Sequence, residues 1–172
     1  MGPIIIFLLI TVSLALQGSF LALVSPSGVH PDLLLVVVVA LALLSDSKRG
    51  ALVGLVAGLM QDIVFGAPLG FFAFIKVLIG AMAGSLAEEI NRDFVLAPML
   101  LVTFFSLFND LMPFILKEFA NITQTFPLLQ YLQQFSPSRL VMHFFIMGLI
   151  YPYLCQAQKR RLLFSQTEST SK

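Results

Sequence analysis

The sequence predicts an all-α, polytopic membrane protein, with six transmembrane helices bundled in a single domain over residues 1–172. Three observations predict this class. Hydrophobic residues make up 58% of the 172 positions and charged residues only 11%, with a mean hydropathy of +0.95. Soluble domains carry about a quarter charged residues. Apolar segments long enough to cross a roughly 30 Å hydrocarbon layer also recur along the chain, and short polar connections separate them.

The six apolar segments predict helices of about 15 to 23 residues each. The first has no basic n-region and no small-residue cleavage site, so we expect a retained helix and not a signal peptide. The second and third are short. Gly, Pro, Asn and charged residues mark the turns at 25–31, 45–50, 66–70 and 88–93. The expected spans are 3–24, 31–45, 50–66, 70–88, 94–116 and 137–157.

The fifth connection, over residues 117–136, differs from the others. Its segment 126–135 has apolar residues at helical spacing with glutamines between them. Because it is too short to span a bilayer, it predicts an interfacial helix that lies over the bundle.

Basic residues predict the orientation. An even number of spans places both termini on one side, and seven basic residues fall on that side against two on the other. The positive-inside rule therefore puts both termini in the cytoplasm. The run Lys159–Arg161 could also hold anionic lipid head groups, whereas a net charge of +1 argues against a nucleic-acid partner. The seven are Lys48, Arg49, Arg92, Lys159, Arg160, Arg161 and Lys172, and the two are Lys117 and Arg139.

Two charges fall inside apolar spans. Asp62 lies about 18 Å along the third helix, and Lys76 about 9 Å below the outer start of the fourth, so both lie in the outer half of the membrane. Charges at such depth usually face the bundle interior and find partners. We expect Asp62 and Lys76 to form an ion pair. A ligand-binding polar pocket and a purely structural pair remain equally open.

Other polar residues fall toward the same outer side. Asp110 on the fifth helix and Arg139 on the sixth complete a set of four with Asp62 and Lys76. Asp32 opens the second helix on that side. Asp32 and Arg139 are both close enough to water for their charges to reach the membrane interface. His143 is expected to be a hydrogen-bonded packing residue and not a ligand.

Glycines recur every four residues on two of the helices, which creates smooth faces where backbones can approach closely. Such stripes could bind either a neighbouring helix of the same chain or the helix of a partner. The first alternative is favoured, because small-residue stripes are common within bundles. The stripes are Gly50, Gly54 and Gly58 on the third helix and Gly80 and Gly84 on the fourth.

Enzyme templates do not fit the sequence. It has no zinc-protease motif, no Gly-x-Ser-x-Gly nucleophile elbow and no phosphate-binding glycine loop followed by Lys. His30 and His143 alone make no convincing metal site, and Cys155 has no partner for a disulfide. We therefore expect no enzymatic activity, no cofactor and no metal.

Three motifs in order carry a family resemblance. They are Pro31-Asp32 at the start of the second helix, the glycine run from Gly50 that ends in Gly-Leu-x-x-Asp at Asp62, and Gly-x-Pro-Leu-Gly at 66–70. With six spans on a chain of this length, the sequence resembles the MreD family of bacterial rod shape-determining membrane proteins. The resemblance implies a non-enzymatic component of the lateral peptidoglycan machinery in the cytoplasmic membrane. Implied partners are MreC, the MreB filament, RodA and a class B penicillin-binding protein.

The MreD family is in turn similar to the substrate-binding S components of energy-coupling-factor transporters, which are six-helix bundles with an outward-facing pocket. That similarity implies that Asp62, Lys76, Asp110 and Arg139 would lie where an S component holds its ligand. Two hypotheses follow: a scaffold for MreC and peptidoglycan synthases, or a solute-binding subunit of a vitamin or micronutrient transporter. The scaffold is favoured, because no Trp and only three Tyr are present to recognise a flat vitamin ring.

Overall fold

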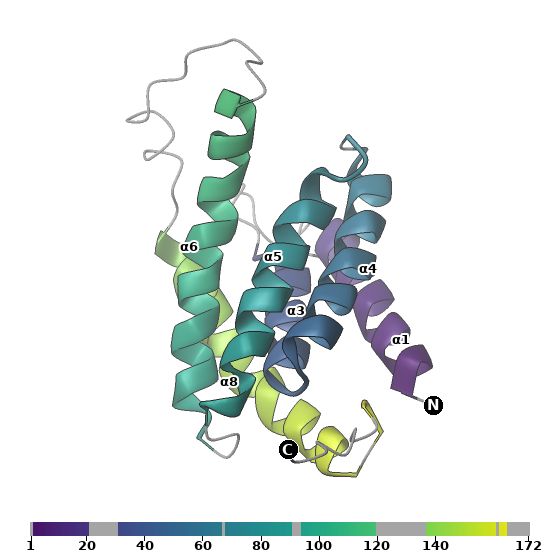
Figure 1. Cartoon of the computed structure of the whole chain (residues 1–172), viewed down its shortest axis with the longest axis vertical. Coiled ribbons are helices and arrows are strands. Elements are labelled where there is room, and N and C mark those ends of the chain that lie inside the picture. The colour runs from purple at the N-terminus through teal and green to yellow at the C-terminus, as the bar shows by residue number, and fades with distance from the viewer. Residues whose placement is uncertain are drawn as a thin grey trace, which may run out of the picture.

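The computed structural model describes residues 2–20, 31–66, 68–90, 94–119, 137–160 and 162–164, and within them it is all-α, as expected (Figure 1). Helix α1 continues as a π-helix over Leu16–Phe20, and α5 continues as a 3-10 helix over Leu86–Glu88. The expected interfacial helix at 126–135 lies outside the described residues. The described residues contain six α-helices, which are α1 (Gly2–Ala15), α3 (Leu33–Leu43), α4 (Ser47–Phe65), α5 (Phe71–Ser85), α6 (Leu96–Phe119) and α8 (Pro137–Lys159).

Helix α3 is the buried centre of the bundle. Every side chain from Leu34 to Leu44 is at most 3% exposed, as a helix that is apolar on all sides requires. Helices α1, α4, α5, α6 and α8 all contact it. Its 11 residues rise only about 16 Å, roughly half of the hydrocarbon thickness. The described part of the expected second span is therefore too short to cross a bilayer by itself.

Helices α4 and α5 form a tightly packed hairpin. Asp46 caps α4, since its carboxylate accepts a hydrogen bond of 2.9 Å from the Arg49 backbone N–H. This cap makes α4 begin three residues before the expected position. The turn between the helices contains two glycines with positive φ, Gly66 at 66° and Gly70 at 99°, a conformation that side-chain-bearing residues rarely adopt.

Length and composition support membrane crossing for three segments: 71–88, 96–113 and 137–159. The regions 2–18 and 33–43 are apolar but shorter. Helix α4 carries Lys48, Arg49 and Asp62 within its 19 residues, which lowers its hydropathy. The expectation of six spans is thus supported as six helices, of which three are long and apolar enough to cross a bilayer by themselves.

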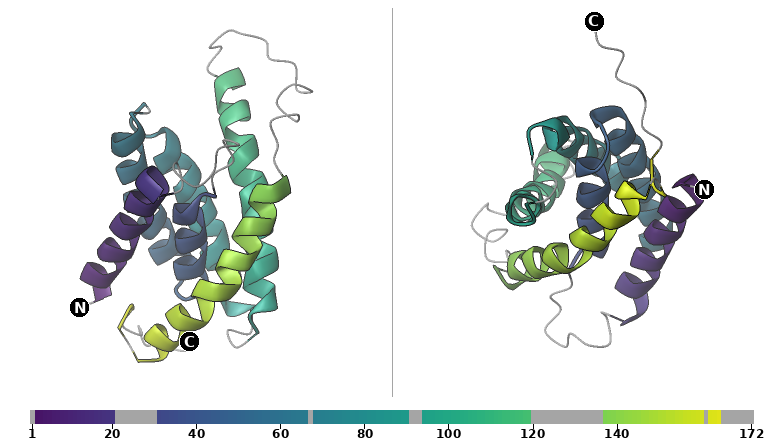
Figure 2. Two further views of the ribbon diagram at one scale, coloured as in Figure 1. Left: turned by 180° about the vertical axis from the view of Figure 1, so that it is seen from behind. Right: turned by 90° about the horizontal axis from the view of Figure 1, so that it is seen from below.

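Helix α1 begins and α8 ends at the same end of the bundle (Figures 1 and 2). At that end Gly2 packs so closely on the backbone of Leu163 that a Cβ on Gly2 would overlap the Leu163 carbonyl oxygen. An even number of membrane crossings would place both termini on the same side. That this side is cytoplasmic remains a prediction.

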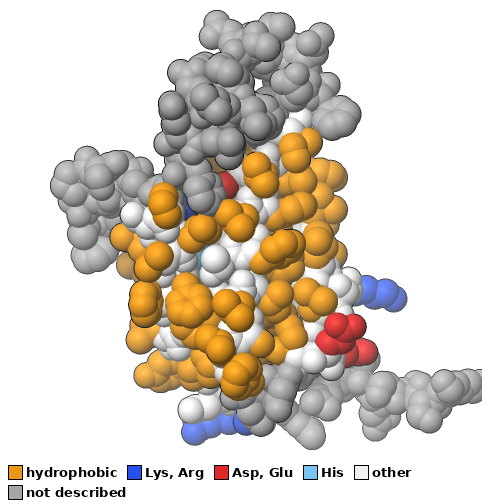
Figure 3. All heavy atoms as spheres, turned by 90° about the vertical axis from the view of Figure 1, so that its left-hand side faces the viewer, with side chains coloured by type: hydrophobic (Ala, Val, Ile, Leu, Met, Phe, Trp, Pro, Cys, Tyr) orange, Lys and Arg blue, Asp and Glu red, His pale blue; other side chains and the backbone are white. Residues whose placement is uncertain are grey.

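Large apolar side chains cover the outside of the bundle. They are exposed on every described α-helix except α3, and they dominate the face formed by α6 and α8 (Figure 3). Soluble monomers rarely expose apolar patches larger than a few hundred Å², so this surface fits a lipid solvent. Examples are Ile4 on α1 (76% exposed), Ile63 on α4 (71%), Phe74 on α5 (51%), Leu100 on α6 (58%) and Leu149 on α8 (70%).

Candidate functional site

Polar side chains from four helices converge at the N-terminal end of α3. We call this group the α3 cluster and define it as Asp32, Lys76, Ser106, Asn109 and His143. Side chains of α5, α6 and α8 meet there because each of these helices packs against α3.

An ion pair forms the centre of the α3 cluster. The Lys76 Nζ lies 2.5 Å from Asp32 Oδ2 and donates a second hydrogen bond of 3.1 Å to Asn109 Oδ1. Lys76 is completely buried, and the Asp32 side chain is 13% exposed. An unpaired charge at membrane depth is costly, so each of these groups needs the other to remain there.

Asp32 also organises the start of α3. Its Oδ1 accepts a hydrogen bond of 2.8 Å from the Leu35 backbone N–H, which caps the helix that Asp32 was expected to open. Its own backbone N–H donates to His143 Nε2 at 2.7 Å. One residue thus binds Lys76 through one oxygen, its own helix through the other, and α8 through its backbone.

His143 is fully buried between two hydrogen-bond partners. Because Nε2 accepts from Asp32, a neutral ring carries its proton on Nδ1. Nδ1 therefore donates to Ser106 Oγ, 2.7 Å away on α6. The prediction that His143 is a hydrogen-bonded packing residue is confirmed.

Asp62 does not bind Lys76, and the expected ion pair between them is wrong. The Asp62 carboxylate instead accepts three backbone hydrogen bonds, from Gly70 (2.8 Å), Phe72 (2.8 Å) and Ala73 (3.3 Å). These N–H groups are at the start of α5, where a helix has no internal acceptors. The 66–70 turn brings this end of α5 to Asp62, which is only 1% exposed, and so supplies nearer partners than a lysine further along the helix.

The orientation of Lys76 follows from the glycines. A Cβ on Gly54 of α4 would overlap the Lys76 carbonyl oxygen, so the backbone of α5 lies directly against α4 at this level. The Lys76 side chain extends to Asp32 at the start of α3 and to Asn109 on α6. The similar depths of Asp62 and Lys76 on neighbouring helices predicted that their charges could meet. They do not meet, because the two side chains extend in different directions.

All five predicted glycines lie in the contact between α4 and α5. Cβ atoms on Gly50 and Gly80 would each overlap the other's backbone carbonyl oxygen, one on Gly58 would overlap the Ala73 backbone, and one on Gly84 would come within 2.6 Å of the Asp46 carbonyl oxygen. These close approaches support the intramolecular alternative, because the stripe is occupied by contacts between α4 and α5.

Asp110 and Arg139 make a second ion pair, beside the α3 cluster. Arg139 Nη1 lies 3.1 Å from Asp110 Oδ1 and joins α8 to α6. The Arg139 side chain is 29% exposed and the Asp110 side chain 14%. The four residues predicted as one pocket therefore take part in three arrangements: the α5 cap, the α3 cluster and this pair.

Asn109 and Ser106 were missed as members of the cluster. Both are polar residues on the apolar helix α6, a position from which polar groups usually face the bundle interior. They lie one helical step apart, and that spacing could have indicated a shared inward face. Their partners, Lys76 and His143, could not have been read from α6 alone.

The α3 cluster links α3, α5, α6 and α8 through hydrogen bonds among its own members. Within the described part of the chain, no three His, Cys, Asp or Glu side chains lie close enough together to hold a metal ion. Cys155 on α8 is buried, 8% exposed. The observed contacts fix four helices relative to one another.

Comparison with known proteins identifies one family. Residues 1–160 match the family described as MreD, rod shape-determining protein MreD. No curated protein and no solved structure matches the chain.

Proposed function

This chain belongs to the MreD family of rod shape-determining proteins, and from this premise we propose that it is a scaffold of the bacterial cell-elongation machinery. The family is non-enzymatic and acts in rod-shape determination as a multi-pass membrane protein. In our proposal the chain holds MreC in the cytoplasmic membrane and, with it, RodA, a class B penicillin-binding protein and the MreB filament.

The family match over 160 residues is the observation that carries this proposal. The site geometry supports it as well. A scaffold needs helices held in fixed positions, and the α3 cluster ties four of them together. Because the glycine stripe is used inside the chain, we propose that partners bind elsewhere, on the exposed apolar faces or the connections between helices.

The same geometry gives less support to a solute-binding transporter subunit. A solute bound by Lys76 or Asp32 would have to replace an ion pair of 2.5 Å and the hydrogen bond from Lys76 to Asn109. Breaking a buried pair costs about 3–5 kcal/mol, which the solute's own contacts would need to offset.

Copurification and complementation would test the scaffold. The tagged chain should retain coexpressed MreC through detergent extraction and size-exclusion chromatography, and it should restore rod shape to a bacterium that lacks its own MreD. An unrelated multi-pass protein with the same tag controls for nonspecific capture. Failure to retain MreC, together with failure to restore rod shape, would overturn the proposal.

A charge-neutral variant separates the two hypotheses. Asp32→Asn combined with Lys76→Met removes both charges of the cluster but leaves no buried charge unpaired. If the cluster is structural, the double variant should still bind MreC and restore rod shape, provided that it folds. A folded double variant that binds MreC but no longer supports rod shape would favour a ligand at the α3 cluster.

A further inference from the structure

A groove between α1 and α4 has features that the scaffold function does not use. It has a volume of about 400 Å³, within the range of roughly 300–1,000 Å³ typical of ligand sites. Its floor contains the buried residues Ile10 and Val53, and its open side contains Phe7 and Val56, which are 54% and 41% exposed. The remaining lining residues are Pro3, Ile6, Arg49, Leu52, Leu163 and Phe164.

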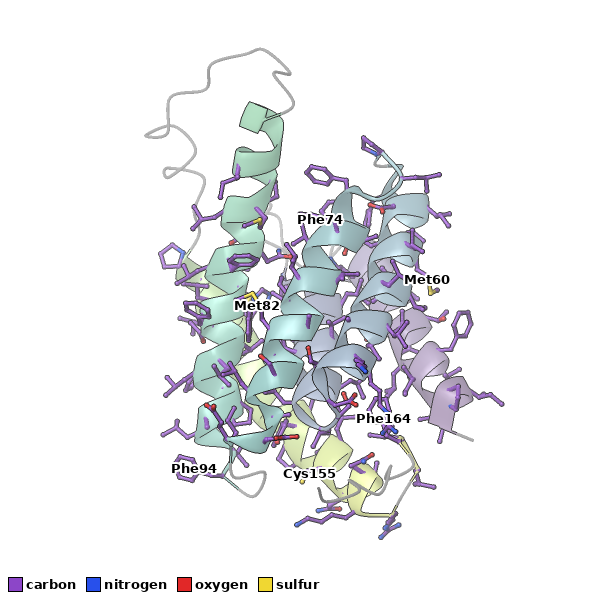
Figure 4. The ribbon with its side chains drawn as sticks, in the orientation of Figure 1. Met60, Phe74, Met82, Phe94, Cys155 and Phe164 are labelled. Carbon is purple, nitrogen blue, oxygen red and sulfur yellow. The ribbon has the colours of Figure 1, made fainter. Side chains whose placement is uncertain are left out.

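The groove is closed at one end by the segment after α8. Phe164, labelled in Figure 4, lies at the end of the bundle where α4 begins. The Gln158 side chain holds this segment in place: its Oε1 accepts from the Phe164 backbone N–H at 3.0 Å, and its Nε2 donates to the Phe164 carbonyl oxygen at 3.5 Å. Leu163 is 3% and Phe164 9% exposed, so both contribute packed apolar surface to the groove.

Arg49 brings a positive charge to this closed end. Its Cζ lies 5.7 Å from the centroid of the Phe164 ring, and its Nε lies 3.9 Å from Asp46 Oδ1. A guanidinium has five N–H donors in a planar fork that suits phosphate oxygens. The Arg49 side chain is 28% exposed, so it is placed to bind a further anion.

The dimensions favour a lipid chain over a partner helix. The lining residues run from Pro3 to Ile10 on α1 and from Arg49 to Val56 on α4, which corresponds to about 10 Å along each helix. A transmembrane helix needs about 20 residues and is about 10–12 Å wide. The groove covers only part of such a helix, whereas the part of a narrow hydrocarbon chain next to its head group can enter the groove from the lipid side.

We propose that this groove binds one anionic phospholipid, with an acyl chain between α1 and α4 and its phosphate on Arg49. The proposal is independent of the scaffold function. An apolar slot ending in a cation is complementary to a molecule whose apolar chain ends in a phosphate. The lipid would fill the space between α1 and α4 and so hold the first helix against the bundle.

Native mass spectrometry of the full-length, delipidated chain would test this. Phosphatidylglycerol and phosphatidylcholine with identical chains would be added separately. Both lipids offer a phosphate to Arg49, but the quaternary ammonium of phosphatidylcholine repels the guanidinium and cancels the net charge of the head group, so we expect phosphatidylglycerol to bind about tenfold more tightly. Arg49→Gln should remove most of that preference. Lys48→Gln is the matched control, since it removes the same charge from an exposed neighbour that does not line the groove.

A second variant keeps the test independent of Arg49. Val56→Phe places bulk in the open side of the groove and should weaken the binding of both lipids several-fold, while the elution volume stays unchanged. Equal binding of the two lipids, equal losses from Arg49→Gln and Lys48→Gln, or no effect of Val56→Phe would each overturn the proposal. Competition by glycerol phosphate, which has no acyl chain, would also overturn it, because it would show a phosphate site that does not need the groove.

Discussion

The ammonium of Lys76 lies 2.5 Å from the carboxylate of Asp32, although 44 residues separate them in the chain. This contact joins the α4–α5 hairpin to the first turn of the central helix. Because Asp32 also caps α3 and binds His143 through its backbone N–H, a disturbance at Lys76 should reach three other helices.

A double-mutant cycle should show that Asp32 and Lys76 depend on each other. Lys76→Met leaves a buried carboxylate unpaired, and Asp32→Asn leaves a buried ammonium unpaired, so each should lower stability by about 3–5 kcal/mol. The double variant should lose less than the sum of the two. Thermal unfolding in detergent would measure all three.

Asp62→Asn serves as the control for this cycle. Asp62 binds backbone N–H groups of α5 and shares no hydrogen-bond partner with the Lys76 side chain, so its effect should add to that of Lys76→Met within about 0.5 kcal/mol. Coupling of Lys76 to Asp62 and not to Asp32 would contradict the observed geometry.

The helices and the cap residue Asp32 could be predicted from the sequence because they depend on local signals: long apolar stretches, Gly and Pro turns, and an Asp before an apolar run. The glycine stripes were equally visible, since a four-residue repeat fixes one helix face. The length of α3 was overestimated, because a fully buried apolar helix and a short membrane span have the same composition.

The ion-pair partners could not be predicted because hydropathy gives the depth of a charge and not the direction of its side chain. Asp62 and Lys76 have similar predicted depths, yet the free N–H groups at the start of α5 bind Asp62 first. Only the packing of Gly54 against Lys76 shows which way the lysine must extend.

Asp62→Ala should destabilise the α4–α5 hairpin strongly. It removes the acceptor of three backbone hydrogen bonds, and each buried N–H left unsatisfied costs about 1–3 kcal/mol. Asp62→Asn keeps one acceptor oxygen and should lose less. Thermal unfolding of both would be compared with Asp46→Ala, which removes a more exposed cap of α4 and should cost only about 0.5–2 kcal/mol. A smaller loss for Asp62→Ala than for Asp46→Ala would contradict the proposed capping role.

Gly54→Ala should lower stability even though it adds a single methyl group. The new Cβ would overlap the Lys76 carbonyl oxygen, and backbone cannot rotate away as a side chain can, so overpacking should cost about 1–3 kcal/mol or more. Gly18→Ala is the matched control, because nothing lies within 4 Å of a Cβ there. If Gly54→Ala keeps full stability but no longer retains MreC, the glycine stripe serves a partner after all.

The orientation of the chain is testable by cysteine labelling. Seven basic residues on the side of the termini against two on the other predict that both termini are cytoplasmic, and the meeting of Gly2 with Leu163 places the two ends of the described chain together. In a Cys155→Ser background, a cysteine at Ser169 should resist a membrane-impermeant maleimide in intact cells and react after lysis. A cysteine at Thr125, in the connection between α6 and α8, should react in intact cells and thus control for reagent access. Labelling of the Ser169 position in intact cells, with protection of the Thr125 position, would show that the orientation is inverted. Labelling of both would show that an even number of segments, or none, crosses the membrane between them, and that the expected topology is wrong.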